Sequence, residues 1–319
     1  MAAGNTTARI PSKLINLSVK ALSQSMTTKL MQSLSRSIIP NYDLFQRTGI
    51  PRSVAIPNVT AAKQVVRDMI SHQSFLDFIL LLIKTSEHGY MGRRYAIPYL
   101  KPLINGVIDM GYIYDKENDM FVENPALRRT RNWGTLKTGH TYTFAFLRID
   151  VVGSSAMVRT YDSESVNRCY KDLRAIVQHI TEKRNGRIWG WDGDGGLAAF
   201  FYGNKNQNAV LSGMEILHEI FLYNLSNNPL GEQVRVRIAV HNGPFSYSQN
   251  YEDLKNSETV QIAEEMEHKL SPPNGLTLSE VVQVMLDHNI LAQLIEKKEK
   301  GSRKYFLYGM NKTYGRKKK

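Results

Sequence analysis

Two aspartates beside glycine-rich turns are the residues whose surroundings best support chemistry. Asp150 follows an apolar run, Thr141–Ile149, and precedes three small residues, Gly153, Ser154 and Ser155. Asp194 lies in Trp-Asp-Gly-Asp-Gly-Gly at 191–196, between two strand-like segments. Carboxylates at such strand ends suit Mg²⁺, which typically takes one or two carboxylates together with substrate phosphates. Acidic, glycine-rich clusters also form ordinary turns, so composition alone leaves both interpretations open.

The turn Val151–Ser155 can also offer backbone N–H groups to the phosphates that such metals carry. Two metals would neutralise a triphosphate and stabilise a displacement at phosphorus. Other chemistries have weaker signals. The eight histidines show no zinc-ligand spacing with the single cysteine, Cys169. The sequence also lacks the Gly-x-x-x-x-Gly-Lys-Ser/Thr phosphate loop.

The elements that must position these turns follow from apolar periodicity. The predicted order is strand, helix, hairpin, helix and strand, which is the outline of a ferredoxin-like palm and an α+β fold. A further helix and a final strand follow it. The predicted strands are Thr141–Ile149, Gly186–Trp191, Leu197–Tyr202, Val234–Val240 and Lys304–Tyr308, and the predicted helices are Val166–Lys183, Asn208–Tyr223 and Val260–Leu270.

Five ordered segments resemble the motifs of class III adenylate and guanylate cyclases. Residues 146–155 (Phe-Leu-Arg-Ile-Asp-Val-Val-Gly-Ser-Ser) resemble the first metal motif, an apolar strand ending in Asp before two aliphatic residues and Gly. Residues 193–200 (Gly-Asp-Gly-Gly-Leu-Ala-Ala-Phe) resemble the second. Residues 236–243, 260–267 and 276–280 resemble the Arg-Ile-Gly-Ile-His-x-Gly strand, the helix with the transition-state Asn and Arg, and the strand after it. The resemblance covers about Thr141–Tyr308 and implies a divergent member of this family.

The resemblance implies a metal-dependent enzyme that converts a nucleoside triphosphate to a 3′,5′-cyclic nucleotide and pyrophosphate. It places two Mg²⁺ or Mn²⁺ ions on Asp150 and Asp194, assisted by the carbonyl of Val151. It also implies a head-to-tail homodimer, in which one subunit supplies the aspartates and the other the Asn and Arg. Here those two positions are Gln261 and Glu265. Glutamate cannot replace the cation that stabilises the developing phosphate charge.

The positions that read a purine in the family also differ. The Lys six residues before the second metal Asp is Ile188, and the Asp that selects adenine is Leu254. We therefore expect a base other than standard adenine, such as the pyrimidines used by bacterial antiphage members of this family; antiphage defence is one role that this implies. The substrate-binding candidates are Arg187 for the base edge, Trp189 and Trp191 for stacking, and Lys300, Arg303 and Lys304 for the triphosphate.

Two alternatives stay open. Glu265 favours a catalytically silent module that binds nucleotide or a partner, with Trp189 and Trp191 as ordinary strand residues. The net charge of +12 and a pI near 9.6 favour anionic partners, including nucleic acid, which we rank last. Retention of both aspartates favours the active enzyme, because a scaffold has no use for two carboxylates in a cleft.

The region before the cyclase-like domain (139–312) has two predicted parts. Residues 1–45 form a basic segment in which Ile15, Val19, Leu22, Met26 and Leu30 make an apolar helical stripe. The stripe fits an anionic membrane surface, a partner helix or packing on its own chain; a transit peptide also fits its composition.

Residues 46–138 form a helical domain and a linker, Asn124–His140. Its helices, Val59–Ile83 and Ile97–Met110, and the hairpin Tyr112–Tyr114/Met120–Val122 have a winged-helix-like outline. Arg93, Arg94 and Lys101 would then contact phosphates.

Residues 313–319 are a basic tail. The single cysteine predicts a reducing compartment, and the longest apolar run, Phe78–Ile83, is too short to cross a bilayer. No secretory signal is evident after Met1. We expect a cytoplasmic protein, with peripheral membrane attachment through residues 1–45 as an option.

Overall fold

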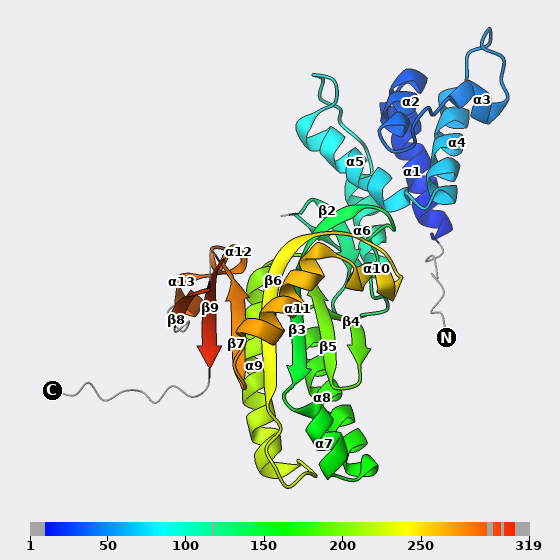
Figure 1. Ribbon diagram of the computed structural model, residues 1–319. Coiled ribbons are helices and arrows are strands. Elements are labelled where there is room, and N and C mark those ends of the chain that lie inside the picture. The colour runs from blue at the N-terminus through cyan, green and yellow to red at the C-terminus, as the bar shows by residue number, and fades with distance from the viewer. Residues whose placement is uncertain (1–9, 117, 292–295, 301–302, 310–319) are drawn as a thin grey trace. The chain divides into compact units, whose positions relative to one another are not determined.

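The computed structural model describes residues 10–116, 118–291, 296–300 and 303–309, and it divides into two compact units, Met1–Thr135 and Leu136–Lys319 (Figure 1). The predicted tail 313–319 and the last residues of the predicted catalytic domain, 310–312, lie outside the described residues. Among the described residues, no helix has both the length and the apolarity that crossing a bilayer requires.

The N-terminal unit is a helical bundle with one hairpin. The helices are α1 (Ser12–Ser25), α2 (Thr28–Arg36), α3 (Leu44–Thr48), α4 (Asn58–Ser71), α5 (Phe75–His88) and α6 (Leu100–Asp109), and the hairpin strands are β1 (Tyr112–Asp115) and β2 (Met120–Glu123). Leu22 and Met26 are buried in a core shared with α4 and α5, and the rest of the predicted stripe packs against that core. The N-terminal helix therefore packs on its own chain.

One prediction for this unit was wrong, whereas the boundary between the two units falls inside the predicted linker, Asn124–His140. The helix predicted over Val59–Ile83 is broken between α4 and α5, because Gln73 adopts a left-handed φ of 54° and the amide of Ser74 bonds back to the carbonyl of Met69. The segment predicted as a linker is packed as far as Trp133, which is fully buried. The buried Glu123 carboxylate orders it by accepting bonds from backbone amides of Arg129 and Thr130.

The C-terminal unit is built on a seven-stranded sheet of order β4-β5-β3-β6-β7-β9-β8. Its strands are β3 (Thr141–Val151), β4 (Arg187–Asp192), β5 (Gly195–Phe200), β6 (Val236–Ser246), β7 (Gly275–Ser279), β8 (Glu296–Lys300) and β9 (Arg303–Gly309). Its helices are α7 (Ser154–Thr160), α8 (Ser163–Lys183), α9 (Lys205–Ser226), α10 (Tyr251–Lys255), α11 (Glu258–Leu270), α12 (Glu280–Gln283) and α13 (His288–Leu291).

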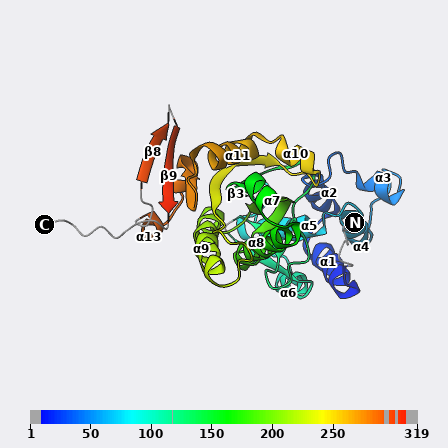
Figure 2. The same cartoon turned by 60° about the horizontal axis from the view of Figure 1, so that its bottom comes forward.

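The first four strands and two long helices form the predicted palm. In chain order they are β3, α8, β4, β5, α9 and β6, and the strands pair antiparallel in the order β4-β5-β3-β6. This is the ferredoxin-like arrangement. Helices α8 and α9 cover one face of the sheet, whereas α10 and α11 lie on the other (Figure 2).

Strand β3 divides its side chains between the two faces. Ala145, Leu147 and Ile149 enter the apolar core under α8 and α9. The alternate residues, Phe144, Phe146, Arg148 and Asp150, point to the opposite face because side chains alternate along a strand. The first half of that face is therefore aromatic and the second half charged.

Candidate active site

The two predicted metal ligands are brought together by the pairing of β3 with β5. Ile149 lies opposite Gly196, so the turn that carries Asp194 stands beside the end of β3. A Cβ on Gly195 would lie 2.8 Å from Asp150 Oδ1 and 2.8 Å from the carbonyl oxygen of Ile149. Only glycine leaves this space open, and the Asp150 carboxylate points into it toward the turn.

The other oxygen of Asp150 is held by an arginine on β6. Arg237 is the cross-strand partner of Asp150, and its Nη2 lies 2.8 Å from Asp150 Oδ2. Arg237 Nε lies 2.7 Å from Oε1 of Glu267 on α11. Asp150 is thus oriented before any ligand arrives, with Oδ1 facing the turn.

Glu267 is the most perturbed acid of this cluster. Its side chain is only 4% exposed. Burial, reinforced by the negative charge of Asp150, raises the pKa of Glu267 to about 7, although Arg237 and Arg148 oppose the shift. Burial thus favours the neutral, protonated form of Glu267 beside the ion pair of Arg237 and Asp150.

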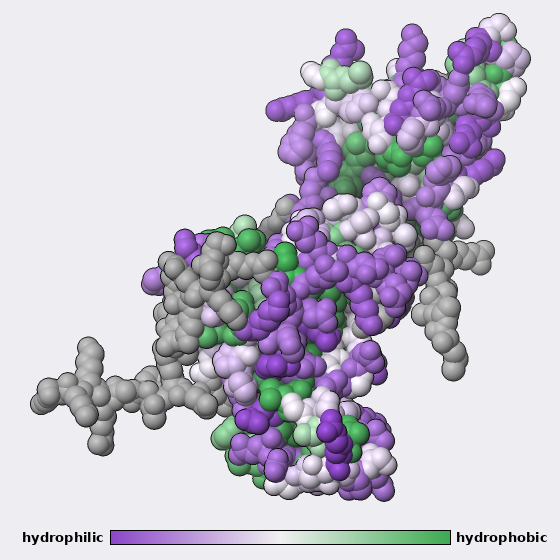
Figure 3. Space-filling model, viewed as in Figure 1, coloured by the Kyte–Doolittle hydropathy of each residue, from purple (hydrophilic) through white to green (hydrophobic). Residues whose placement is uncertain are grey.

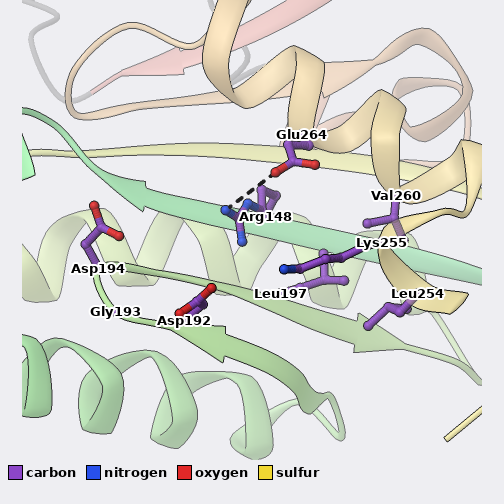
Figure 4. Close-up of a pocket in the computed structure, with 9 residues that line it drawn as sticks. All are labelled: Arg148, Asp192, Gly193, Asp194, Leu197, Leu254, Lys255, Val260 and Glu264. Carbon is purple, nitrogen blue, oxygen red and sulfur yellow. Dashed lines mark ion pairs between the residues drawn. The ribbon is translucent and has the colours of Figure 1, made fainter. Parts of the chain in front are cut away.

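A cavity of about 300 Å³ opens on this face, between the β4–β5 turn and helices α10 and α11 (Figure 4). Its apolar lining comes from Leu197, Leu254 and Val260. Its charged lining comes from three strands or turns and two helices, and consists of Arg148, Asp192, Asp194, Lys255 and Glu264. Hydrophilic side chains also gather over α10 and α11 on the surface (Figure 3).

The glycine-rich turn after Asp150 leads directly into a short helix. Val151 is the buried last residue of β3. Gly153 has a left-handed φ of 75°, and Ser154 and Ser155 begin α7. The predicted turn therefore lies next to Asp150, but Ser154 and Ser155 are helical rather than part of an irregular loop.

Three predicted substrate contacts on β4 are not brought to the cavity. Arg187 is buried and donates to the backbone carbonyl of Gly186 at 3.0 Å. Trp189 is 9% exposed and lies among four aromatic rings, those of Phe144, Phe146, Phe245 and Tyr247, at centroid distances of 4.9–5.8 Å. Trp191 covers Gly196 and donates from Nε1 to the carbonyl of Gly193 at 3.1 Å.

The remaining predicted residues lie elsewhere on the same unit. On α11, Val260 and Glu264 line the cavity, whereas Gln261 is exposed and Glu265 pairs with Lys269 at 3.1 Å. Lys304 on β9 lies 3.9 Å from Glu280. Lys300 ends β8 and Arg303 begins β9.

Sequence reasoning missed four charged residues of the cavity: Arg148, Asp192, Lys255 and Glu264. One signal was available, because Arg148 stands two residues before Asp150 and so shares its face of β3. His241 and Cys169 are not among the residues that line the cavity. His241 Nδ1 lies 2.9 Å from Ser279 Oγ, a structural contact, and Cys169 is fully buried.

The donor set fits a hard divalent cation that also binds substrate. Asp150 and Asp194 offer carboxylate oxygens, and Mg²⁺ is usually held by one or two carboxylates plus phosphates and water. The buried hydroxyl of Tyr170 hydrogen-bonds to none of the described residues. The pKa of this hydroxyl is raised by burial first, and then by the negative charges of Asp194, Cys169 and Asp150. Among the described residues, no cluster of three or more His, Cys, Asp or Glu forms a metal site unaided.

No family model matches the sequence, and no curated protein matches it. Solved structures that resemble it include class III cyclase domains. One is the guanylate cyclase domain of RhGC from Catenaria anguillulae in complex with GTP, with 16% identity, 53% of this chain and 96% of that chain covered, and a TM-score of 0.44. Another is the adenylate/guanylate cyclase/hydrolase from Silicibacter pomeroyi, with 17% identity, 53% of this chain and 98% of that chain covered, and a TM-score of 0.43. A third is the adenylyl cyclase CyaB from P. aeruginosa, with 15% identity, 54% of this chain and 95% of that chain covered, and a TM-score of 0.43. Because of its strand order, its strand pairing and the five ordered motifs, we conclude that the C-terminal unit has the fold of the class III nucleotide cyclases.

Proposed function

We propose that the C-terminal unit is a metal-dependent nucleotidyl cyclase, which converts a nucleoside triphosphate to a 3′,5′-cyclic nucleotide and pyrophosphate. The observation that carries this proposal is the convergence of Asp150 Oδ1 and the Asp194 turn on the space left by Gly195. A carboxylate oxygen that borders this space, and a second carboxylate on the adjoining turn that lines the charged cavity, are suited to holding divalent cations on a triphosphate.

In this reaction the ribose 3′-oxygen attacks the α-phosphorus. A bond forms between them, the bond from the α-phosphorus to the oxygen bridging to the β-phosphate breaks, pyrophosphate leaves, and the hydroxyl proton passes to solvent. Bound Mg²⁺ or Mn²⁺ would neutralise the triphosphate and favour ionisation of the hydroxyl. Asp150 and Asp194 would hold two such ions with the carbonyl of Val151, and Arg237 would keep Asp150 oriented.

The base is proposed to be other than adenine, with a pyrimidine favoured. Leu254, at the family's adenine-selecting position, lines the cavity with an apolar side chain that cannot accept from an amino group. Ile188, at the purine-reading lysine position, packs against the apolar core under α8 and α9. Neither residue can make the hydrogen bonds that the family uses for a purine.

A head-to-tail homodimer is part of the proposal. Gln261 is exposed and Glu265 is half-buried, on the row of α11 beside the one that lines the cavity. Side chains there are accessible to a second copy of the chain, as the family arrangement requires.

The second candidate is a catalytically silent nucleotide-binding module. It is favoured by Glu265, which pairs with Lys269 and places a carboxylate where the family has its transition-state arginine. Such a protein would bind metal and triphosphate without releasing pyrophosphate.

The deciding experiment incubates the full chain with Mn²⁺ or Mg²⁺ and each of ATP, GTP, CTP and UTP, and identifies products by mass spectrometry. A cyclic monophosphate from one of them, lost in Asp194→Asn, supports the enzyme and names its base. No product from any of the four, with folding and dimerisation intact, favours the silent module.

A further inference from the structure

A cation inside the cavity has no counterpart among the residues that the family resemblance assigns. Arg148 interrupts the apolar run of β3 and lines the cavity together with Asp194 (Figure 4). We propose that Arg148 binds the polyphosphate chain of the nucleoside triphosphate, so that one chain supplies both the metal-binding carboxylates and a phosphate-binding cation. This inference rests on the proposed function, because it assumes that the ligand of the cavity is a triphosphate.

The position of the guanidinium supports this assignment. A Cβ on Gly195 would stand 3.5 Å from Arg148 Nη2 and 2.8 Å from Asp150 Oδ1. Both groups therefore border the same small space, next to the turn that carries Asp194. A phosphate bound beside Asp150 and the Asp194 turn would therefore also contact this guanidinium.

Arg148 is also poorly satisfied in the absence of a ligand. Its carboxylate neighbour, Glu264, is 3.8 Å away and has a side chain that is 55% exposed. Its Nε is buried and hydrogen-bonds to none of the described residues. A single contact of 3.8 Å to a carboxylate that is more than half exposed is a weak ion pair, so an anionic ligand can displace Glu264.

Arg237, the other arginine of this face, differs in this respect. It lies within 2.8 Å of Asp150 and within 2.7 Å of Glu267, so its charge is balanced by two carboxylates. Arg237 is therefore engaged in positioning Asp150, whereas Arg148 retains capacity for a further anion.

The chemistry of the side chain selects the phosphate. A guanidinium presents a planar fork of donors that matches two phosphate oxygens. The Arg148 side chain is only 19% exposed, and its backbone pairs with Leu197 on β5 and Ala239 on β6. Such a side chain loses little freedom on binding. Glu265, at the family's arginine position, offers no cation.

The test measures binding of the Mn²⁺ complex of inorganic tripolyphosphate to the full chain by titration calorimetry. This probe has no base and no ribose, so it isolates the phosphate contacts. Arg148→Met should weaken binding about tenfold or more, since charge-assisted hydrogen bonds are lost. The affinity of Arg148→Lys should lie between those of the wild type and Arg148→Met, because an ammonium group keeps the charge but not the planar fork of donors. Glu264→Gln should bind more tightly, because the competing carboxylate is neutralised.

Lys255→Met is the matched control, because it removes one positive charge from the same cavity. It should weaken binding less than about threefold if the loss in Arg148→Met is local. Binding of Mn²⁺ alone by Arg148→Met should not fall, which shows that the aspartates remain in place.

Several results would overturn the inference. One is that the wild-type chain does not bind tripolyphosphate, and another is that Arg148→Met and Lys255→Met lose the same binding affinity. A third is that Arg148→Met loses affinity for nucleoside triphosphates but none for tripolyphosphate, which would indicate a contact with the base. The proposed function is judged separately. If the wild-type chain makes cyclic product and Arg148→Met binds tripolyphosphate as tightly as the wild type, only the role of Arg148 is overturned. If Arg148→Met binds tripolyphosphate more weakly but the wild-type chain makes no product, only the cyclase activity is overturned.

Discussion

The space at Gly195 is the most direct point at which to perturb the candidate site. In Gly195→Ala the new methyl group would stand 2.8 Å from both Asp150 Oδ1 and the Ile149 carbonyl oxygen. The carbonyl belongs to the central strand β3, which is paired on both sides and cannot retreat alone. The carboxylate or the β4–β5 turn must therefore move.

The distance sets the size of the effect. Ordinary contact begins at 3.4 Å, so a neighbour must retreat by about 0.6 Å. That exceeds the ~0.5 Å within which a functional site holds its geometry and the ~0.2 Å tolerance of metal–ligand distances. We expect Mn²⁺ affinity to fall about 10–100-fold, the size seen when ligand orientation is lost. Overpacking should lower the free energy of unfolding by about 1–3 kcal/mol.

Mn²⁺ binding followed by electron paramagnetic resonance, together with urea unfolding, measures both quantities. Gly231→Ala is the matched control, because a Cβ there meets only Tyr161 at 3.7 Å or more. Mn²⁺ affinity and stability in Gly195→Ala that match those of Gly231→Ala would refute the convergence of Asp150 and the Asp194 turn on this space.

Three further outcomes are expected. The folded-state pKa of Glu267 is about 7 against an ordinary 4.5, so the folded chain holds this proton more tightly than the unfolded chain. The free energy of unfolding should therefore fall by up to about 3 kcal/mol as pH rises from 4.5 to 7, and Glu267→Gln should show a flatter profile in urea titrations; parallel profiles would contradict this. Trp189→Ala should cost about 3–5 kcal/mol by calorimetry, with Trp189→Phe losing less, and a loss below ~1 kcal/mol would be inconsistent with a packed ring. Burial raises the pKa of the Cys169 thiol, so iodoacetamide should label it only after unfolding, and fast labelling of the native chain would count against this.

The palm was predictable because its strands and helices have clear periods. Strand boundaries were less so. The prediction ended β6 at Val240, because His-Asn-Gly-Pro at 241–244 is a poor strand sequence. In the structure β6 continues to Ser246, because residues 241–246 pair with the first half of β3. Strand β8, Glu-Lys-Lys-Glu-Lys, was not predicted, since only its pairing with β9 at the sheet edge makes it a strand.

The candidate site was predictable only where motif and local chemistry coincide. Asp150 and Asp194 stand out beside glycines, and the structure places their turns together. Trp189 was interpreted as a base-stacking residue, with an ordinary strand residue as the alternative. Its neighbours, including Phe144 and Phe245, come from distant strands, and no local pattern reveals that they enclose it. The sequence did not predict that Lys255 lines the cavity, for the same reason: the packing of α10 depends on tertiary contacts.

Because side chains alternate along β3, both the folding of the sheet and the binding of ligand depend on one register of this strand. Shifting the strand by one residue would turn Arg148 and Asp150 into the apolar core and bring Leu147 and Ile149 to the open face. Burying two charges among aliphatic side chains is prohibitive, so no slipped form competes with the native one. Insertion of one residue within Phe144–Asp150 should therefore prevent the C-terminal unit from folding. We expect this strand to tolerate only substitutions that keep apolar residues on the side of α8 and α9 and polar residues on the side of the cavity.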